Sequence, residues 1–447
     1  MADTDGTSMH TQHPEGPDVV TLASELIRID TTNRGGGDGQ ERPAAEYVAE
    51  RLAEAGIEST LVESAPGRAN LVTRVAGTEP GLPGLLVHGH LDVVPADPTE
   101  WSVDPFSGEI RDGMVWGRGA VDMKDMVAMM LTVARGWGFS GRRPRRDVVF
   151  AFTADEEDTA AYGAGWLAEH RPELFEGCTE GISESGGYTF HANGRRLYPV
   201  GAGERGTAWL KLTAHGTAGH GSKVNRDNAV GALAAAIARI DAYEWPVRLS
   251  PTVRAALAGI GRALDIPVDL DDPEFDVDAL LDRFGPARHL VETTVRNSAN
   301  PTMPEAGYKV NVIPELAAAR VDGRVVPGAR EEFEKTIDML TGPRVDWEYY
   351  HTEIPLSAPV DSPTFLAMAE ALRAEDPDAD VVPYCMGGGT DAKQFSRLGI
   401  TGYGFAPLLL PPDLDLAPLV HGVDERVPVE GLRFGARVLD RFLSTVG

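Results

Sequence analysis

The feature that most constrains the fold is an alternation of continuous apolar runs with helical patterns early in the chain. The runs at 84–87 and 148–153 have the length and composition of strands buried on both faces. The apolar spacing at 19–29 and 42–55 is typical of amphipathic helices, and the stretch at 123–137 is predicted to be a helix that follows a turn. Strands that alternate with helices predict an α/β domain with a mostly parallel central sheet, in which sites form beyond the carboxyl ends of the strands.

The pattern changes near residue 203 and changes back near residue 356. Strand-like stretches and one helix between these points predict a smaller α+β domain inserted into the first. The 447 residues allow two or three domains at about 150 residues each. We predict two: a first domain made of 1–202 and 356–447, and a second made of 203–355. The Pro- and Asp-rich stretch at about 245–296 is predicted to be an insertion of helices and loops.

Charge and composition narrow the class of protein. The net charge of −27 argues against binding to nucleic acid or to an anionic membrane. No run approaches the roughly 20 apolar residues of a membrane span, and the opening residues lack the basic and apolar regions of a signal peptide. We therefore expect a cytoplasmic protein, with frayed residues 1 to about 17. Cys178 and Cys385 lie outside any CxxC spacing and are expected to be buried free thiols.

Five polar clusters, each ending or following an apolar run, contain two imidazoles and several carboxylates. They are Gly-His90-Leu-Asp92, Val-Asp122-Met-Lys, Asp-Glu156-Glu157, Ser-Glu184-Ser and Val-His421-Gly. Each has an ordinary structural explanation by itself, for example a satisfied core histidine at 90, a helix N-cap at 122 or an acidic first turn at 156 and 157. Together, such groups in one domain would repel or desolvate one another unless cations organised them. Their nitrogen and oxygen atoms are the donors that zinc and its neighbours accept.

The donor set has a chemical use in amide hydrolysis. That reaction needs a hydroxide nucleophile, a Lewis acid and a proton carrier, which two metal ions about 3.5 to 4 Å apart and one carboxylate supply. Asp122 is the strongest candidate for the ligand shared by both ions. His90 is a natural terminal ligand, and Asp92 is near enough in sequence to orient its ring. Glu156 and Glu157 are adjacent, so one can bind metal while the other faces the water.

Four stretches of the chain also resemble a known family. They are Gly-His-Leu-Asp-Val-Val-Pro at 89–95, Trp-Gly-Arg-Gly-Ala-Val-Asp-Met-Lys at 116–124, Thr-Ala-Asp-Glu-Glu at 153–157 and Gly-Gly-Gly-Thr-Asp at 387–391. In combination they resemble the M20 metallopeptidases, which include aminoacylase, glutamate carboxypeptidase, acetylornithine deacetylase and succinyl-diaminopimelate desuccinylase. The resemblance runs from about residue 19 to the C-terminus. It implies a zinc-peptidase catalytic domain with a lid or dimerisation domain, and two divalent ions, usually Zn²⁺, with Co²⁺ or Mn²⁺ as alternatives.

The resemblance also implies a role for each residue of the donor set. Asp122 would bridge the two ions, one of which would also be held by His90 and Glu184, and the other by Glu157 and His421. Glu156 would act as the general base that takes a proton from the bridging water and passes it to the departing nitrogen. The peptide bond between Asp122 and Met123 is expected to be cis.

In the lid, the resemblance implies contacts with substrate. Asn311 and Arg324 would hold a substrate carboxylate, which an arginine binds through two parallel hydrogen bonds. Arg324 beside Asp322 on a strand would equally suit an ion pair. His220 would reach the scissile carbonyl, in dimeric relatives from the partner subunit, whereas His215 is expected to be structural.

Two further features bear on the substrate and on assembly. The glycine-rich loop that contains Gly388 lacks a following lysine, which favours backbone contact with substrate over a phosphate cradle. The insertion at about 245–296 is longer than in compact family members and resembles the larger carboxypeptidase and N-acyl-amino-acid hydrolase branch. Dimerisation through the lid, and delivery of His220 to a partner, are therefore left open.

The predicted function is a binuclear zinc hydrolase that cleaves an amide or peptide bond next to a free carboxylate, as in an N-acyl amino acid or a dipeptide. One alternative is a deacylase of acetylornithine or succinyl-diaminopimelate, whose cationic substrate would suit an acidic protein. Another is a metal-binding pseudoenzyme, which the presence of Glu156 and all five ligand candidates disfavours. The expected partner is a small-molecule or dipeptide substrate with a free carboxylate, with neither nucleic acid nor membrane, and homodimer formation through the lid is left open.

Overall fold

The computed structural model of the protein describes residues 18–447, and the expectation for residues 1–17 lies outside this part of the chain. The chain forms two compact units. The first runs as far as Thr179 and resumes at Ala406–Gly447, and the second is Glu180–Phe405. We retain as a proposal the division at residues 202 and 355 into catalytic and lid parts, which places the whole lid inside the second unit.

The strands of the first unit are in the order β1 (Thr60–Ala65), β2 (Arg68–Val75), β6 (Val148–Thr153) and β3 (Gly84–His90). Every residue of β3 and β6 is buried, and the two strands pair in parallel, with His90 opposite Thr153. β2 pairs antiparallel with β6 and with β1. The apolar runs predicted to be buried strands thus form a parallel pair whose carboxyl ends reach the same edge.

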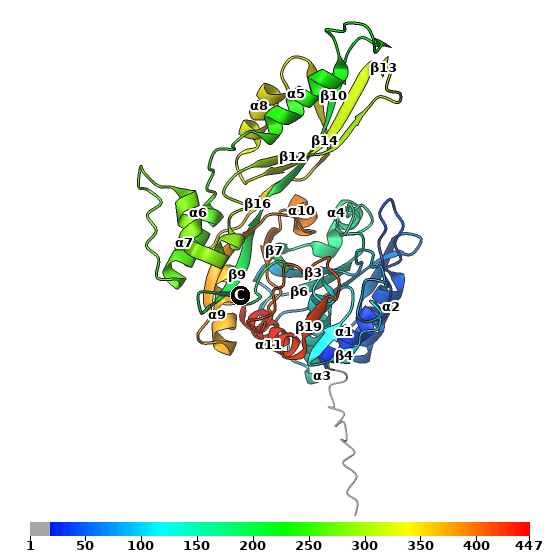
Figure 1. Cartoon of the computed structure of the whole chain (residues 1–447). Coiled ribbons are helices and arrows are strands. Elements are labelled where there is room, and N and C mark those ends of the chain that lie inside the picture. The colour runs from blue at the N-terminus through cyan, green and yellow to red at the C-terminus, as the bar shows by residue number, and fades with distance from the viewer. Residues whose placement is uncertain (1–17) are drawn as a thin grey trace, which may run out of the picture. The chain divides into compact units, whose positions relative to one another are not determined.

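Four helices of the first unit pack against one another: α1 (Val19–Ile27), α2 (Arg42–Glu54), α3 (Lys124–Ser140) and α11 (Val429–Thr445). Figure 1 shows this helical layer beside the strands. α4 (Ala164–His170) and the 3₁₀ turn η1 (Pro172–Phe175) follow β6. A small sheet of β19 (Arg426–Pro428), β5 (Met114–Trp116) and β4 (Ile110–Arg111) fastens the C-terminal segment to the stretch before residue 122.

The second unit contains a second group of strands outside the lid, which we call the base strands. β7 (Cys178–Ser183), β18 (Thr401–Gly404), β9 (Arg195–Glu204) and β16 (Leu356–Ser357) follow in this order, and β8 (Phe190–Ala192) and β17 (Asp380–Met386) also pair with β9. The pairs β7–β18 and β9–β17 are parallel, as is β3–β6 in the first unit. Two further helices belong to this part, α9 (Pro363–Glu375) and α10 (Ala392–Phe395), the second continued by η3 (Ser396–Leu398). The predicted α/β fold with a mostly parallel central sheet is confirmed.

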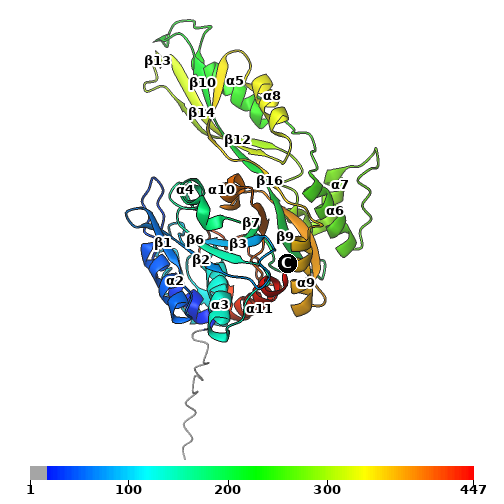
Figure 2. The same cartoon turned by 180° about the vertical axis from the view of Figure 1, so that it is seen from behind.

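The lid is an antiparallel sheet in the order β12 (Ser298–Ala306), β14 (Leu316–Val325), β10 (Gly206–His215) and β15 (Val345–Thr352). Burial alternates along β10 and β14, so one face carries the core, which includes Leu210, Val321 and Phe333. α5 (Ala229–Asp241) and α8 (Arg330–Thr341) cover that face (Figure 2). The short pair β11 (Gly219–His220) and β13 (Val312–Ile313) completes the predicted α+β domain.

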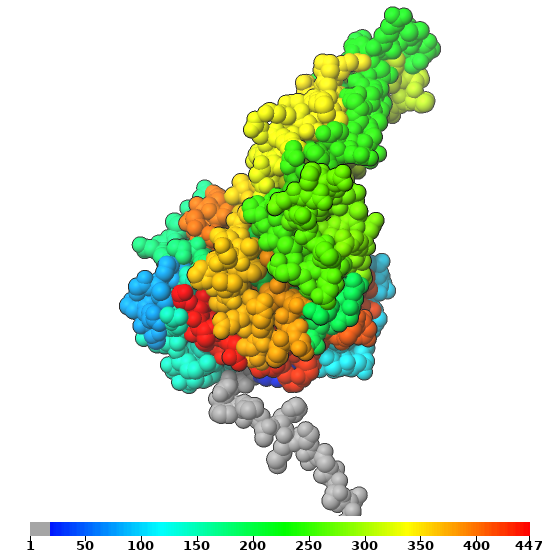
Figure 3. Space-filling model, turned by 90° about the vertical axis from the view of Figure 1, so that its left-hand side faces the viewer, coloured from blue at the N-terminus to red at the C-terminus, as the bar shows by residue number. Residues whose placement is uncertain are grey.

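The insertion consists of α6 (Pro251–Ala263), α7 (Val277–Phe284) and η2 (Gly285–Leu290), the helices and loops that were predicted. α6 packs on β17 and β9, in a core that includes Leu257, Leu197 and Val382 and that is separate from the core of the lid sheet. Figure 3 shows the bright-green surface of the insertion beside the amber surface around α9. The insertion therefore interrupts the lid in the sequence, but its helix α6 packs against the base strands.

Two expectations from composition can be compared with the structure. Both cysteines are buried and free, as predicted. Within residues 18–447, none of the helices combines the length and the apolar character that a bilayer crossing requires.

Candidate metal centre

Four of the predicted metal ligands lie within contact distance of one another in the first unit. His90 Nε2 is 3.0 Å from Asp122 Oδ1, and His421 Nε2 is 3.2 Å from Asp122 Oδ2. His421 Nε2 is also 3.0 Å from Glu157 Oε2. Asp122 thus directs one oxygen to each histidine, which is the arrangement that a carboxylate shared by two cations requires.

Local structure explains why these side chains meet. His90 is the last residue of β3, and Glu157 lies in the turn after β6, the parallel neighbour of β3. Asp122 precedes α3, and the bond between Asp122 and Met123 is cis, as expected. His421 comes from the loop before β19 and has a positive φ of 60°. Two strand ends and two turns therefore supply the four side chains.

The chemistry of this donor set fits divalent cations. The ligand atoms of His90, Asp122 and Glu157 lie within 4.8 Å of one another. Glu157 Oε1 is buried and has no hydrogen-bond partner, although leaving a buried carboxylate oxygen unpaired is costly. A positive ion beside it would remove that cost. Two imidazoles and two carboxylates are ligands that Zn²⁺, Co²⁺ and Mn²⁺ accept.

The pKa shifts within the centre also favour a bound cation. Hydrogen bonds to Asp122 and Glu157 raise the pKa of His421 to about 10. Burial acts to raise the pKa of Asp122, but the hydrogen bonds from His421 and His90 hold it well below its ordinary value. Burial raises the pKa of Glu157. A proton on His421 thus supplies the positive charge that the paired carboxylates attract, which is the charge a metal ion would supply instead.

Asp92 has contacts different from those expected of it. His90 Nδ1 is 2.9 Å from the backbone oxygen of Asp92 and 3.6 Å from its carboxylate Oδ1, so the carbonyl is the closer partner of the ring. The Asp92 carboxylate accepts hydrogen bonds from the backbone nitrogens of Glu156 at 3.2 Å and Glu157 at 3.1 Å. Burial acts to raise the pKa of Asp92, but hydrogen bonds from His90 and Asn33 lower it below its ordinary value. Asp92 therefore organises the Glu156–Glu157 turn as well as facing His90.

Glu156 lies at the edge of the centre. Its Oε2 atom is 3.9 Å from His90 Nε2, and its side chain is more exposed than that of Glu157. The adjacent glutamates thus approach different histidines, since Glu157 contacts His421. This arrangement is compatible with one carboxylate that binds metal and one that exchanges protons.

A buried network beside the centre was missed by sequence analysis. Arg68 donates hydrogen bonds to Glu41 and to Asp155, each at 2.7 Å at its shortest, and all three side chains are buried. Asn33 Nδ2 joins this network to the centre, because it donates to Asp155 at 3.1 Å and to Asp92 at 2.9 Å. The one local signal is the run of four acids at 155–158, of which the predicted site uses only Glu156 and Glu157.

The remaining predicted residues belong to the second unit. Glu184 directly follows β7, and Gly388 lies in the loop between β17 and α10, so both follow base strands. His220 and Asn311 are exposed and close together, because Gly221 N donates to the Asn311 oxygen at 3.0 Å. The roles assigned to these residues stay predictions.

Arg324 lies far from that pair. It is opposite Thr207 near the start of β10, whereas β11 and β13 adjoin the other end of the lid sheet, where Leu316 is opposite His215. The eight steps along the strand from residue 316 to residue 324 span roughly 27 Å at about 3.4 Å each. Arg324 also forms the ion pair with Asp322 that sequence analysis raised as an alternative, with Nε to Oδ1 at 2.7 Å. Asn311 and Arg324 of one chain are therefore far apart along the lid sheet, and their joint contact with one substrate carboxylate stays a prediction.

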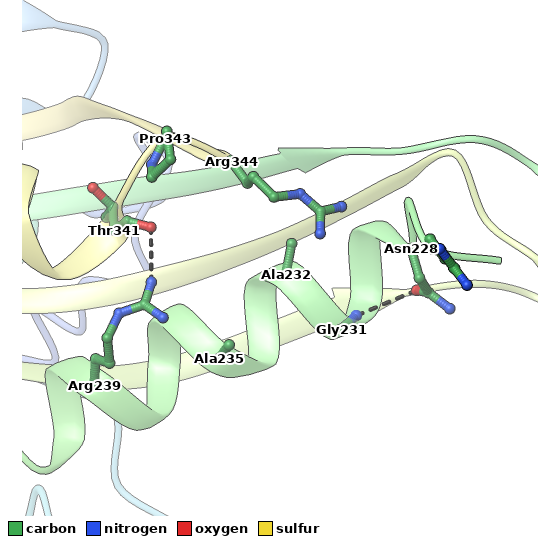
Figure 4. Close-up of a pocket in the computed structure, with 9 residues that line it drawn as sticks. Asn228, Gly231, Ala232, Ala235, Arg239, Thr341, Pro343 and Arg344 are labelled. Carbon is green, nitrogen blue, oxygen red and sulfur yellow. Dashed lines mark hydrogen bonds between the residues drawn. The ribbon is translucent and has the colours of Figure 1, made fainter.

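A cavity of about 410 Å³ lies elsewhere on the lid, between α5 and the connection from α8 to β15 (Figure 4). Two of its three arginines have structural partners: Arg239 donates to the backbone oxygens of Leu340 and Thr341, and Arg344 pairs with Asp227 at 3.0 Å. None of the predicted site residues lines this cavity. The candidate centre therefore remains the cluster at the ends of β3 and β6.

Comparison with known proteins gives a consistent family. Residues 86–445 match the model of peptidase family M20/M25/M40. The human N-fatty-acyl-amino acid synthase/hydrolase PM20D1 is 29% identical over 371 residues, which cover 80% of this chain and 72% of the relative. Human aminoacylase-1 is 27% identical over 441 residues, which cover 97% and 95% of the two chains.

Solved structures share the fold. An M20 family metallo-carboxypeptidase from Sulfolobus solfataricus superposes with a TM-score of 0.70 at 19% identity, covering 96% of this chain and 99% of the other. The YXEP protein of Bacillus subtilis, described as a dinuclear metal-binding peptidase of the M20 family, gives a TM-score of 0.63 at 14% identity, covering 96% and 97%. Both likenesses extend over the catalytic and lid parts.

Proposed function

Because the chain belongs to peptidase family M20/M25/M40, we propose that it is a two-metal hydrolase that cleaves the amide bond of N-acyl amino acids. The family makes it a hydrolase. The single observation that carries the metal-dependent mechanism is Asp122, with one oxygen directed to each of two histidines. The cleaved bond would lie next to a free carboxylate, and dipeptides are the second substrate class to be tested.

The residues proposed to hold the ions are His90, Asp122, Glu157, His421 and, from the second unit, Glu184. We propose Zn²⁺, with Co²⁺ or Mn²⁺ accepted by the same donors. When bound, the ions would polarise the scissile carbonyl and lower the pKa of water. Asp92 would keep the Glu156–Glu157 turn in place through the two backbone hydrogen bonds.

Glu156 is proposed as the proton carrier. A general base must lie within hydrogen-bond reach of the water it activates, and Glu156 is at the edge of the ligand cluster, 3.9 Å from His90 Nε2. It would take the proton of the attacking water and return it to the nitrogen of the leaving amino acid. Its partial exposure suits this role, because a carboxylate that changes protonation must remain accessible to substrate.

The choice of N-acyl amino acids rests on the relatives. Aminoacylase-1 and N-fatty-acyl-amino acid synthase/hydrolase both carry that substrate class in their names, and aminoacylase-1 aligns with nearly the whole chain. Arg324 would bind the carboxylate of the amino acid, exchanging part of its pairing with Asp322 for the substrate. Gly388 would offer backbone contacts.

We further propose that a second copy of the chain supplies His220 and Asn311. The separation of these residues from Arg324 along the lid sheet supports this, because one chain cannot bring all three to one small substrate. Mixing inactive His220→Ala and Glu156→Gln chains tests it. Half of randomly paired dimers would contain one complete site, so activity should return to about a quarter of the wild-type value. No recovery in a confirmed mixed dimer would refute sharing of the site.

The experiment that tests the proposed function is metal analysis combined with a substrate panel. The panel contains N-acetyl and N-oleoyl amino acids, dipeptides, acetylornithine and succinyl-diaminopimelate, assayed before chelation, after chelation and after return of Zn²⁺. Near-two equivalents of metal and chelator-sensitive hydrolysis of N-acyl amino acids are expected. A protein that takes up no metal would favour the scaffold alternative, and preference for acetylornithine or succinyl-diaminopimelate would favour the deacylase. A cytoplasmic location stays a proposal, to be tested by cell fractionation.

A further inference from the structure

A buried carboxylate outside the predicted donor set, Glu425, lies against the turn that ends in Asp122. Its side chain has no exposed surface. Oε1 accepts hydrogen bonds from the backbone nitrogens of Val121 at 2.7 Å and Asp122 at 3.1 Å. Oε2 accepts from Gly119 N at 3.0 Å and from Arg118 Nη1 at 2.7 Å. Both oxygens of Glu425 are thus fully used by donors from residues 118–122.

The same contacts connect the turn to the segment that carries His421. Glu425 is four residues after His421, and its backbone oxygen accepts from Gly117 N at 2.9 Å. Arg118 reaches the backbone oxygen of His421 at 3.3 Å and that of Pro95 at 3.4 Å. Pairing of β19 with β5 continues the connection on the far side of Glu425. Glu425 and Arg118, which are not among the proposed metal ligands, therefore connect the loop of His421 to the turn of Asp122.

We propose that Glu425 is a positioning residue that holds the Asp122 turn so that one carboxylate oxygen of Asp122 faces His90 and the other faces His421, where both would be available to metal ions. This inference rests on the proposed two-metal function. A buried carboxylate close to another one is costly, and one arginine would suffice to compensate it if Glu425 only stabilised the fold. Three backbone donors between residues 119 and 122 instead define where the turn lies, as second-layer contacts do for ligands at metal sites.

Replacing Glu425 by glutamine distinguishes a residue that positions the Asp122 turn from one that only fills a buried space. Glu425→Gln keeps the shape but replaces one oxygen by an NH₂ group. Whichever way the amide is turned, this group faces two N–H donors, either those of Val121 and Asp122 or those of Gly119 and Arg118. Two donors lose their acceptor and the turn must move. The matched control is Asp376→Asn, because Asp376 is also buried and accepts from Arg196 at 2.6 Å and Tyr198 at 2.9 Å.

The experiment titrates Co²⁺ into metal-free wild type, Glu425→Gln and Asp376→Asn, and records affinity, the visible spectrum and the Tm of each metal-free protein. Roughly 10- to 100-fold weaker Co²⁺ binding and an altered Co²⁺ spectrum are expected for Glu425→Gln alone. Asp376→Asn should lower Tm and keep wild-type affinity and spectrum. A lower Tm with wild-type Co²⁺ affinity and spectrum in Glu425→Gln would overturn the inference and leave the proposed function intact.

Two further outcomes are decisive. If Glu425→Gln does not fold, Glu425→Asp keeps the charge and withdraws the oxygens by one methylene group. The same loss of affinity and change of spectrum, with a smaller fold-change, then support positioning, whereas wild-type binding overturns it. Failure of the wild type itself to bind Co²⁺ would refute the proposed function, and the inference with it.

Discussion

The proposed metal ligands of the first unit and the lid residues proposed to contact substrate differ in how far they are organised without a ligand. The side chains of His90 and Glu157 are 1% and 5% exposed and each contacts another ligand candidate. His220 and Asn311 are exposed, and Arg324 is paired with a neighbour on its own strand. The comparison teaches that the proposed metal ligands are pre-organised by the fold, whereas the proposed substrate contacts would be completed only when a ligand binds.

His421 qualifies this contrast. It is about half exposed and comes from a loop, as the lid residues do, yet two carboxylates hold it in place. Exposure alone therefore does not separate the two regions. What separates them is whether oppositely charged partners already surround the side chain.

The largest effect is expected from the adjacent glutamates. Glu156→Ala should lower kcat by roughly 10²- to 10⁴-fold with unchanged metal content, because a general base contributes about that factor. Glu157→Gln is the matched neighbour and should lower metal affinity as well. Steady-state kinetics with metal analysis distinguish the two. If Glu156→Ala retained full activity, Glu156 would not be the base and the pre-organised region would need another proton carrier.

An intermediate effect is expected at the lid. Arg324→Ala should raise KM for carboxylate substrates roughly 10- to 100-fold, since a hydrogen bond to a charged group contributes about 1.5 to 3 kcal/mol. kcat should change less. Lys211→Ala, which removes an exposed ion pair with Glu348 on the same sheet, is the control and should leave KM unchanged. An unaltered KM in Arg324→Ala would assign Arg324 to its ion pair with Asp322 alone.

The smallest effect concerns pH. The pKa of His421 is raised to about 10 in the metal-free protein, above its unfolded value of about 6.5. Its stabilising contribution is therefore fully present below pH 6.5 and is lost as the pH rises through 10. Metal-free wild type should show a Tm that decreases over this range, measured by calorimetry, and His421→Gln should flatten the decrease. Metal affinity should rise over the same range, because the ion competes with the His421 proton.

Local sequence patterns were sufficient to predict the strands β3 and β6 and to select the ligand candidates at their ends. β3 and β6 follow from continuous apolar runs, and His90 and Glu157 follow from their positions at or just past the ends of these strands. Asp122 was identified from its place at the mouth of a helix and from the resemblance of its motif. Such residues are predictable because each is tied to the end of an element that the sequence itself defines.

Other parts of the site depend on contacts between distant segments. Glu425 binds the turn before Asp122 from about 300 positions later in the chain, and Arg68 binds Asp155 across 87 positions. No local pattern marks a buried charge of this kind, because its partners become neighbours only after the strands have paired. The packing of α6 on β17 was unpredictable for the same reason.

The placement of α6 and α7 also limits how the protein can be divided. The chain passes from the base strands to the lid sheet between β9 and β10, and it returns to them for α6, α7 and η2. It enters the lid again at β12 and leaves it between β15 and β16. The two connections of the insertion are themselves paired, with Val247 opposite Arg296. Deleting or exchanging the whole 206–352 segment would expose Leu197 and Val382. An interchangeable module in this protein would consist of two separate stretches of lid sequence, with residues 250–296 kept in place.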